Sequence, residues 1–586
     1  MCGIIGYTGK KNSIPIIMDG LSSLEYRGYD SAGISYIKNK EIHTIKSIGK
    51  IENLKNKIDK SLESNTGIGH TRWATHGGVT LNNCHPHTCN SVTLVHNGII
   101  ENYLSLKKIL LDKGYSFYGE TDTEVLAGYI DYCYKETKDK VLAIDKAIKS
   151  ITGSYALGII FNDETDTIYA TRKDSPLIVG LSVDGNFIAS DMPAIAKYTN
   201  KYFLLNTEDI VTLHKSSYIV TNNNKEIKKE ILTYEHSVNE QDLSGYDHYM
   251  LKEINEEPVL IRNNIVKNLD NIPDIKKYKN IYIVGCGSAY HAGLVSKYTM
   301  EKYLKKPVYV YLASEFRYNE LFLTKDDLVI VISQSGETAD TLASLRIAHT
   351  YKATVLALVN VFASSIARES DIVIYTNALT EISVATTKAY IMQVYYLGLL
   401  TIKNSNLDYQ ELFDNYKLLP SLLENVINLN VYKDIAKILS KQKDIYFLGR
   451  KADYAISMEG SLKLKEISYI HSEAYPAGEL KHGTISLIED NTIVISVITD
   501  PTIEDKTCSN ILEVISRGAK SIIIATDDIH VDKQYYDYLI KVPTTIDILK
   551  PLLAVVPLQL LSYYTAVLLG CEIDKPRNLA KSVTVE

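Results

Sequence analysis

Cysteine is scarce in this sequence, and its seven residues are scattered without any CxxC pair. Cysteine pairs at short spacing mark zinc ribbons and redox motifs, and even-numbered sets mark disulfide frameworks. The sequence predicts none of these sites. An excess of one charge is also lacking, since 63 Lys and Arg stand against 70 Asp and Glu. This mild net charge of −7 excludes the strongly basic profile of a general nucleic-acid binder, and we expect no nucleic-acid partner.

Long apolar runs are rare as well. The first residues show no basic segment followed by an apolar core and a small-residue cleavage site, so we expect no signal peptide. One stretch, from Leu552 to Cys571, carries no charged residue over about the length of a bilayer span. A proline and several polar residues interrupt it, which favours a buried interface helix over a membrane span. The sequence therefore predicts a cytoplasmic protein with no membrane partner.

The chain has the composition of a folded protein, with 45% hydrophobic and 23% charged residues. Its length predicts about three or four domains. Short β-type runs between turn signals, with helical stretches between them, fill residues 2–235 and predict an α+β domain built on sheets. We expect a linker at 236–264.

Beyond the linker, apolar strand-like runs alternate with helical patterns, which is typical of parallel α/β units. An internal repeat is visible, because "NIYIVGCGSAY" (280–290) matches "DIYFLGRKADY" (444–454). The repeat predicts two doubly wound parallel-sheet domains at 265–405 and 430–572. A polar tail follows at 573–586.

Cys2 is the most informative residue of the first domain. Removal of Met1 would leave Cys2 with a free α-amine, whose ordinary pKa of about 7.7–8.0 is close to that of the thiol. One residue would then carry both a nucleophile and a general base. Taken alone, an incidental cysteine after the start codon is the commoner explanation.

Four motifs follow Cys2 in order: "LEYRGYDSAG", "GHTRWATHG", "HNGIIENY" and "GETDTE". They supply what amide hydrolysis of glutamine needs. Arg72 can form a fork onto an α-carboxylate, and Asp122 can pair with an α-ammonium. The side chain of Asn97 and the N–H of Gly98 can stabilise a developing oxyanion.

These motifs resemble the class II glutamine amidotransferase family over residues 2–235. The resemblance implies an αββα N-terminal-nucleophile fold, a glutamyl thioester on Cys2 as the nucleophile, and released ammonia, with Trp73 as a gate toward an ammonia passage. The glutamine-binding residues that it implies are Arg27, Arg72, Trp73, Thr75, His76 and Asp122. Five histidines could suggest a metal, but they lack ligand spacing with Cys or carboxylate partners, so we expect pocket walls or core and no metal; they are His70, His76, His85, His87 and His96.

The run "VIVISQSGETADTLASLRIAH" (329–349) predicts a strand, a polar turn and a helix. The hydroxyls of Ser333, Ser335 and Thr338 and the first helical N–H groups would converge on one anion. An ordinary N-capped helix is the alternative. No GK[ST] follows, which excludes a nucleoside-triphosphate P-loop, and "GCGSAYHAG" lacks the dinucleotide fingerprint. The second repeat has "ITDPTIED" at the corresponding place, so one copy is predicted to bind the anion and the other to support it.

The pair of repeats resembles tandem SIS (sugar isomerase) domains, and the whole arrangement resembles the family of isomerizing glutamine–fructose-6-phosphate aminotransferases. That resemblance implies conversion of D-fructose 6-phosphate and L-glutamine to D-glucosamine 6-phosphate and L-glutamate, the first step of amino-sugar synthesis. It implies a homodimer and no cofactor. The sugar-phosphate-binding residues that it implies are Ser288, Ser333, Gln334, Ser335, Thr338 and Val384.

"MEGSLKLKEISY" places Glu459, Lys463 and Glu466 at i, i+4 and i+7, on one face of a predicted helix. A solvated row of ion pairs is the alternative. Ketose-to-aldose conversion needs a base that moves a proton between C1 and C2, and Glu466 suits this role. The resemblance assigns Lys463 to hydroxyl proton transfer, His482 to ring opening and Lys581 to an imine with the open-chain ketose. The pKa of Lys581 would have to be depressed for that reaction.

Other functions stay open at this point. A class II glutaminase with another ammonia acceptor would need a pyrophosphate-binding or ATP-pyrophosphatase motif, and the sequence has neither. A sugar-phosphate deglycase would have no use for Cys2. A non-catalytic sugar-phosphate sensor would tolerate loss of Cys2, Glu466 or Lys581, yet all three are present. Ala289 stands where the family usually has a hydroxyl residue, which puts one hydrogen bond to the sugar phosphate in doubt.

Overall fold

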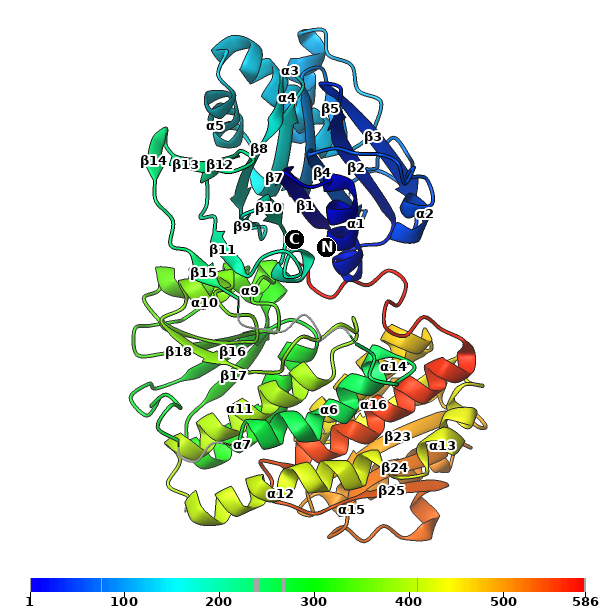
Figure 1. Cartoon of the computed structure of the whole chain (residues 1–586). Helices are drawn as coiled ribbons and strands as arrows, with labels where there is room; N and C mark the ends of the chain where they lie inside the picture. Colours follow the sequence, from blue (N-terminus) through cyan, green and yellow to red (C-terminus); the bar gives the residue numbers. More distant parts are fainter. Residues whose placement is uncertain (1, 75, 235–241, 266–268, 408, 584–586) are drawn as a thin grey trace. The chain divides into compact units, whose positions relative to one another are not determined.

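The structure is a computed structural model, and it describes residues 2–74, 76–234, 242–265, 269–407 and 409–583. The chain divides into two compact units (Figure 1). The first unit comprises residues 1–241 together with 580–586, and the second comprises residues 242–579. Both predicted α/β domains therefore lie inside the second unit, and their separate limits stay a prediction.

Two antiparallel sheets form the first unit. The larger has the order β15-β11-β9-β10-β1-β4-β2-β3, and the smaller has the order β14-β13-β12-β8-β7-β6-β5. The strands of the larger sheet are β1 (Gly3–Gly9), β2 (Ser31–Lys38), β3 (Glu41–Ile48), β4 (Thr66–Arg72), β9 (Ile178–Ser182), β10 (Gly185–Ala189), β11 (Lys201–Leu204) and β15 (Leu232–Thr233). Those of the smaller sheet are β5 (His87–Cys89), β6 (Val92–Ile100), β7 (Gly153–Phe161), β8 (Glu164–Lys173), β12 (Ile210–Leu213), β13 (Tyr218–Asn222) and β14 (Lys225–Ile227).

Successive residues of β1 show how these layers are built. Ile4 packs into the apolar cluster between the two sheets, whereas Ile5 packs with the apolar side of helix α1, as the twofold alternation of a strand requires. Helices cover the outer face of each sheet: α1 (Ser13–Ser23) and α2 (Ile51–Lys55) on the larger, and α3 (Tyr103–Asp112), α4 (Asp122–Thr137) and α5 (Lys140–Ser150) on the smaller. Short 3₁₀ helices η1 (Glu25–Arg27) and η2 (Met192–Ala194) complete the unit. This αββα order confirms the predicted fold class.

Two five-stranded parallel sheets form the second unit, with the orders β17-β16-β18-β19-β20 and β22-β21-β23-β24-β25. In both repeats the first strand lies between the second and the third, so the strand order reverses beside it. Ligands of open α/β sheets bind at the carboxyl ends of the strands at such a switch point. The strands are β16 (Ile281–Gly285), β17 (Val308–Leu312), β18 (Leu328–Ser333), β19 (Thr354–Val359), β20 (Ile372–Tyr375), β21 (Asp444–Gly449), β22 (His471–Pro476), β23 (Ile493–Ile498), β24 (Lys520–Thr526) and β25 (Tyr538–Val542).

One apolar core joins the two repeats, and helices of both repeats contribute to it. The helices of this unit are α6 (Tyr249–Asn263), α7 (Ser288–Leu304), α8 (Ala313–Phe316), α9 (Ala339–Thr350), α10 (Ser365–Glu369), α11 (Lys388–Asn404), α12 (Tyr409–Ile427), α13 (Tyr432–Leu439), α14 (Ala452–Ser468), α15 (Glu504–Ile515) and α16 (Lys550–Leu569), with 3₁₀ helices η4 (Leu480–His482), η5 (Thr484–Leu487) and η6 (Lys533–Tyr535). Parallel sheets in both repeats confirm the predicted α/β class.

Helix α16 contains the charge-free stretch noted in the sequence. Among the described residues it is the one helix long and apolar enough to cross a membrane, and 78% of its most apolar window is buried inside the protein. A helix that is apolar on all sides is expected in the core of a large protein. The burial agrees with the predicted interface helix.

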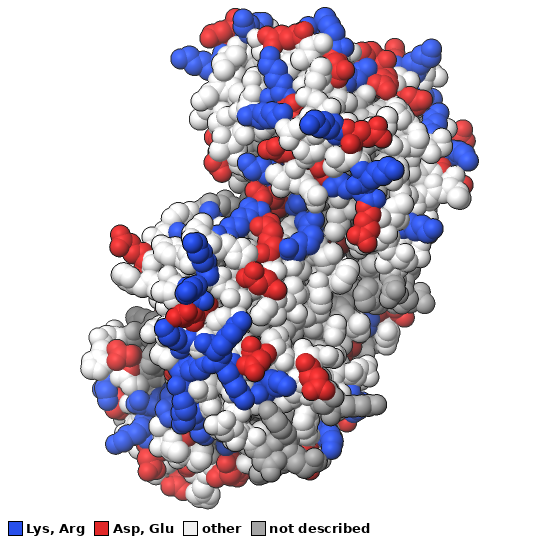
Figure 2. Space-filling model, turned by 90° about the vertical axis from the view of Figure 1, so that its left-hand side faces the viewer, with Lys and Arg blue, Asp and Glu red and all other residues white. Residues whose placement is uncertain are grey.

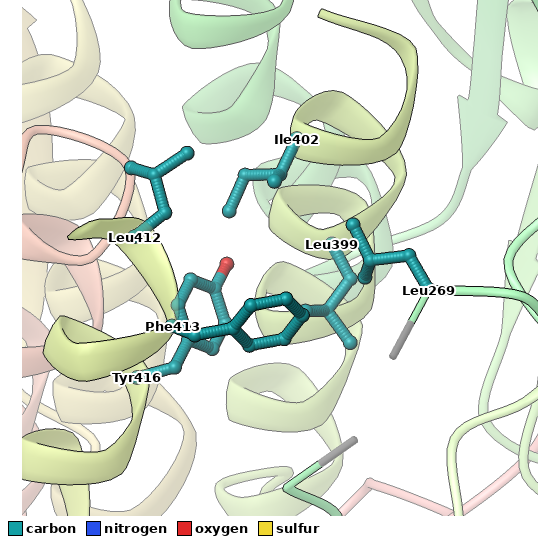
Figure 3. Close-up of a pocket in the computed structure, with 6 residues that line it drawn as sticks. All are labelled: Leu269, Leu399, Ile402, Leu412, Phe413 and Tyr416. Carbon is teal, nitrogen blue, oxygen red and sulfur yellow. The ribbon is translucent and has the colours of Figure 1, made fainter. Parts of the chain in front are cut away.

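Surface charge is mixed on the face shown in Figure 2, where basic side chains gather toward the lower part with acidic side chains among them. In the second unit, an apolar gap too narrow to hold a water molecule lies between α11 and α12 (Figure 3). Its walls carry no ionisable group other than one tyrosine hydroxyl, so we regard it as a packing gap; they are Leu269, Leu399, Ile402, Leu412, Phe413 and Tyr416.

Candidate functional site

Cys2 lies directly before β1, beside the end of β4. The antiparallel register pairs Gly3 with Thr71, which brings Cys2 next to the residues that follow β4. The backbone N–H of Trp73 donates to Cys2 Sγ (3.2 Å), and the thiol contacts the Trp73 carbonyl oxygen (3.4 Å). Burial raises the pKa of the Cys2 thiol, although the nearby Arg72 guanidinium acts in the opposite direction.

Asn97, on β6, is held in one orientation beside Cys2. Its Nδ2 donates to the Cys2 carbonyl oxygen (3.0 Å) and to Ser190 Oγ (2.9 Å). Its Oδ1 lies 3.0 Å from His70 Nε2, which also faces the carbonyl oxygen of His96 (3.0 Å). Because both partners are acceptors, Nε2 of His70 carries the hydrogen. Burial lowers the pKa of His70 to about 3, so the imidazole is neutral.

Gly98 follows Asn97 at a position that tolerates no side chain. Its φ is +136°, and a Cβ there would lie 2.0 Å from the Ser154 carbonyl oxygen on β7. The two predicted oxyanion donors, Asn97 and Gly98, therefore occupy a tightly packed bend next to Cys2.

Arg72 is buried and binds its own loop. Its guanidinium donates to the carbonyl oxygens of His76 (2.6 Å), Gly77 (3.1 Å) and Gly78 (3.2 Å). The loop after Trp73 is fixed at one further point, where the N–H of Ala74 donates to Asp30 Oδ2 (2.9 Å). Arg72 thus shapes the loop that carries the predicted glutamine-binding motif.

The other predicted glutamine-binding residues have partners of their own. Asp122, the first residue of α4, accepts from the N–H groups of Ile100 (2.8 Å) and Thr123 (2.9 Å), and Arg27 pairs with Asp191 (2.7 Å). The Trp73 ring meets Tyr29 edge-on, at 5.9 Å between ring centroids, and the His76 ring meets Tyr103 in the same way at 5.5 Å. Thr75 lies outside the described residues.

Three of the histidines expected as pocket walls or core pack together, His70 stacked on His85 and His85 edge-on to His87. His70 and His85 have ring centroids 4.0 Å apart, and His85 and His87 have centroids 4.8 Å apart. Burial lowers the pKa of His85 and of His87 well below the ordinary value. In the part of the chain that the structure describes, no group of three His, Cys, Asp or Glu side chains could hold a metal ion.

The second unit carries a polar loop at the switch point of its first repeat, between β18 and α9. Ser333 Oγ contacts Thr338 Oγ1 (2.9 Å) and accepts from the N–H of Gly336 (3.0 Å), and Ser335 Oγ accepts from the N–H of Glu337 (3.2 Å). Gly336 has a φ of +64°, and a Cβ there would lie 2.0 Å from Ser364 Oγ.

Three other predicted sugar-phosphate residues lie around the first repeat. Ser288 begins α7 directly after β16, and Gln334 begins the polar loop, where its carbonyl oxygen accepts from the N–H of Asn360 (3.2 Å). Val384 is buried, and its N–H donates to the carbonyl oxygen of Asp574 (2.9 Å). The structure thus places Ser288, Ser333, Gln334, Ser335 and Thr338 at the ends of the two central strands.

Helix α14 of the second repeat presents its charged face to α7 of the first. Lys463 Nζ lies 2.6 Å from Glu466 Oε2, 3.4 Å from Glu459 Oε1 and 3.1 Å from Ser288 Oγ. The side chains of Glu459 and Lys463 are each 1% exposed, and that of Glu466 is 19% exposed. This burial excludes the solvated row of ion pairs. Although burial alone lowers the pKa of Lys463, the carboxylates of Glu466 and Glu459 raise it to about 12.

Two further catalytic residues were predicted, one in each unit. His482 is exposed on η4, and within the described residues its ring has no ion pair with the cluster. Lys581 is half-buried and belongs to the first unit with residues 580–586. The roles of both residues stay predictions.

Two residues that contact the site, Ser190 and His291, were missed by the sequence analysis. Ser190 receives both the Asn97 amide and the N–H of Ile4 (2.8 Å), and no sequence signal marked it. His70 was expected as a pocket wall or a core residue, and its contact with Asn97 places it at the wall of the site. His291 lies 2.8 Å from Glu459, and its spacing of three residues from Ser288 at a helix start could have revealed it.

Comparisons with known proteins agree with this geometry. Residues 274–403 and 438–569 match the SIS domain family model, and residues 82–197 match the glutamine amidotransferase domain model. Glutamine–fructose-6-phosphate aminotransferase [isomerizing] of Clostridium tetani is 48% identical, and that of Methanosarcina acetivorans is 41% identical, each over 100% of both chains. A solved structure, the C-terminal domain of glucosamine-fructose-6-phosphate aminotransferase from Francisella tularensis, is 39% identical with a TM-score of 0.54, and covers 57% of this chain and 100% of its own.

Proposed function

Since this chain belongs to the family of isomerizing glutamine–fructose-6-phosphate aminotransferases, we propose that it converts D-fructose 6-phosphate and L-glutamine to D-glucosamine 6-phosphate and L-glutamate. The observation that carries the proposal is that relatives of this name match over the full length of both chains. Both half-reactions are therefore expected in this one chain. The reaction is the first step of amino-sugar synthesis.

In the glutamine half-reaction, Cys2 is the nucleophile. The buried thiol has a raised pKa, so it needs a base, and the α-amine of Cys2 supplies one once Met1 is removed. Sulfur adds to the side-chain carbonyl carbon of glutamine, while Asn97 and Gly98 donate to the oxyanion. Ammonia leaves with the proton taken from the thiol, and water then releases glutamate from the thioester.

Charge complementarity supports the assignment of the glutamine pocket. Arg72 faces the α-carboxylate of glutamine, and Asp122 faces its α-ammonium group. Arg72 already orders the loop from Trp73 to Gly78, so binding of the carboxylate also acts on Trp73, the gate of the ammonia passage. The pocket is completed by Arg27, Thr75 and His76.

The sugar phosphate binds at the switch point of the first repeat. Hydroxyls and N–H groups between β18 and α9 gather there at a helix N-terminus, which favours a phosphate. Ser288 and Val384 contact the sugar. The phosphate is bound by Ser333, Gln334, Ser335 and Thr338.

The sugar half-reaction requires ring opening, amination and proton transfer. His482 opens the ring, and Lys581 forms an imine at C2 with loss of water. Ammonia then displaces Lys581 from C2, and Glu466 removes a proton from C1 and returns it to C2, which leaves the aldehyde at C1 and the amine at C2. Lys463 transfers the hydroxyl proton. Its 2.6 Å contact with Glu466 supports a joint role.

We propose further that the enzyme is a cytoplasmic homodimer. The buried position of α16 supports a protein outside the membrane. Light scattering on purified protein tests the dimer, and a monomeric mass at working concentration would contradict it.

Isotope transfer tests the function directly. Wild-type protein with [amide-¹⁵N]glutamine and fructose 6-phosphate should give ¹⁵N-labelled glucosamine 6-phosphate by mass spectrometry, undiluted by unlabelled ammonium in the buffer. The variant Cys2→Ala should form none, whereas Lys581→Ala should still hydrolyse glutamine but form no amino sugar. If the wild type formed no labelled product from fructose 6-phosphate but formed one from another sugar phosphate, that sugar phosphate would be the acceptor instead.

A further inference from the structure

The first turn of α7 supplies two donors to one carboxylate of α14. Ser288 Oγ donates to Glu459 Oε1 (2.8 Å), and His291 Nδ1 lies 2.8 Å from Glu459 Oε2. Although burial alone raises the pKa of Glu459, Lys463 and His291 bring it below its ordinary value, so the group is ionised and can only accept. The hydrogen of this contact therefore belongs to Nδ1 of His291. No step of the reaction derived above uses this histidine.

The two carboxylates of α14 compete for a single ammonium group. Nζ of Lys463 donates to Ser288 Oγ (3.1 Å) and forms ion pairs with Glu466 Oε2 (2.6 Å) and Glu459 Oε1 (3.4 Å), so its contact with Glu466 is the shortest. Lys463 can stay on Glu466 because Glu459 has its own donors on α7. Without His291, Oε2 of Glu459 would be a buried anionic oxygen with no partner, which costs about 1–3 kcal/mol or more.

Other titratable groups near Glu459 offer no replacement donor. The buried Tyr390 hydroxyl on α11 acts on Glu459 only through its charge when ionised, and burial raises its pKa well above the ordinary value. Glu381, from the segment before α11, acts on Lys463 and is itself an anion. Within the described residues, Lys463 and His291 are thus the ionisable donors that reach Glu459.

We propose that His291 is a positioning residue of the sugar half-reaction: its Nδ1–H keeps Glu459 ionised and in place, and this leaves Lys463 on Glu466, the residue that moves the proton between C1 and C2. The inference rests on the proposed function. It assigns His291 no contact with the sugar and no change of its own charge, because Nδ1–H is present in the neutral ring as well.

Two substitutions at His291 separate the effect of its hydrogen-bond donor from the effect of its side-chain volume. In His291→Asn the amide Nδ2 takes the place of Nδ1 and cannot ionise, whereas His291→Leu fills the space without a donor. Glucosamine 6-phosphate formation is measured against fructose 6-phosphate concentration at saturating glutamine, from about pH 5.5 to pH 9. The exposed His530 on the same unit supplies the matched control His530→Asn.

The Leu variant should lose up to about 100-fold in kcat, the effect of a small misplacement of a reacting group. The acid limb of the pH–rate profile of this variant should move to higher pH, because Glu459 without the Nδ1–H donor takes up a proton more readily. The Asn variant should restore both properties, which a merely misfolded second unit would not allow, and glutamine hydrolysis on the first unit should be unchanged in both variants. In a Glu459→Gln background, His291→Leu should have little further effect.

Several results would overturn the proposal. One is a Leu variant with the wild-type kcat and acid limb, and another is an Asn variant as defective as Leu. A third is an equal loss from His291→Leu in the Glu459→Gln background. A wild type that forms no glucosamine 6-phosphate would instead contradict the proposed function.

Discussion

Nζ of Lys463 lies 2.6 Å from Oε2 of Glu466, three residues further along the same helix. On the surface such a pair would contribute a few tenths of a kcal/mol. Here the lysine side chain is 1% exposed, and a second carboxylate, Glu459, lies 3.4 Å away on its other side. The pair therefore holds Glu466, the base proposed for the sugar half-reaction, at a fixed place beside Lys463.

Replacement of this lysine tests the arrangement. Lys463→Met leaves two carboxylates without their cation, and breaking a buried pair costs about 3–5 kcal/mol. We expect a lower melting temperature by calorimetry and no glucosamine 6-phosphate. Lys465→Met, two residues along the same helix at an exposed position, serves as the control; equal losses in the two variants would show that burial of the pair is irrelevant.

The raised pKa of the Cys2 thiol predicts how this residue reacts with alkylating agents. Only the thiolate reacts, so the rate of inactivation by iodoacetamide should keep rising with pH through neutrality and beyond the ordinary thiol range. Glutamine should protect the enzyme. Peptide mass mapping at each pH locates the modified residue, and a rate that levels off at or below pH 7 would show that the thiol is activated instead.

Gly336 should tolerate no side chain. Alanine there would combine a φ of +64° with a Cβ 2.0 Å from Ser364 Oγ, so Gly336→Ala should distort the polar loop and raise KM for fructose 6-phosphate while glutamine hydrolysis is retained. Gly114 also has a positive φ (+83°), but a Cβ there would lie in open space. Gly114→Ala therefore measures the cost of the backbone conformation alone, about 1–3 kcal/mol. Matching KM values for the two variants would argue against a sugar-phosphate role of the loop.

Asp453, buried at the start of α14, predicts a pH-dependent stability. Burial raises its pKa to about 7, despite its bonds to the N–H and hydroxyl of Thr499. The unfolded value is about 3.9, so the folded state binds the proton more tightly. The stabilisation is complete below about pH 4 and is lost as the pH rises to about 7, by about 4 kcal/mol in all.

Asp453→Asn keeps the neutral shape and removes this titration. Its melting temperature should change less between pH 5 and pH 8 than that of the wild type, as differential scanning calorimetry can measure. The exposed Asp532 provides the control Asp532→Asn. A wild type and an Asn variant with parallel pH curves would mean that Asp453 stays ionised.

The fold class of both units could be predicted from the sequence, because the pattern of apolar residues along the chain indicates which segments are buried. Short β-type runs between turn signals and the apolar strands of the repeats predicted sheets of the right kind, and the one charge-free stretch was correctly interpreted as the buried helix α16. The site could be predicted only in part. Cys2 meets Trp73 through the register of β1 and β4, and it meets Asn97 through the packing of one sheet on the other, and a motif search supplies neither.

Two local features could not be predicted for a related reason. The i, i+4, i+7 spacing of Glu459, Lys463 and Glu466 is the same for a solvated face and for a buried one, and only packing against α7 distinguishes them. Likewise, the use of the Arg72 guanidinium for its own loop depends on the path of residues 76–78. The sequence identifies the Arg72 guanidinium as a donor, but it does not show which carbonyl oxygens the folded loop brings to it.

The bond between Ser288 and Glu459 joins the opening turn of a helix in one repeat to a helix in the other. The first repeat holds the loop of hydroxyls, and the second repeat holds the carboxylates. Neither repeat alone contains both groups of residues. Two separately expressed repeats should convert the sugar phosphate only when they are mixed. A substitution at this contact in one repeat should require a compensating substitution in the other.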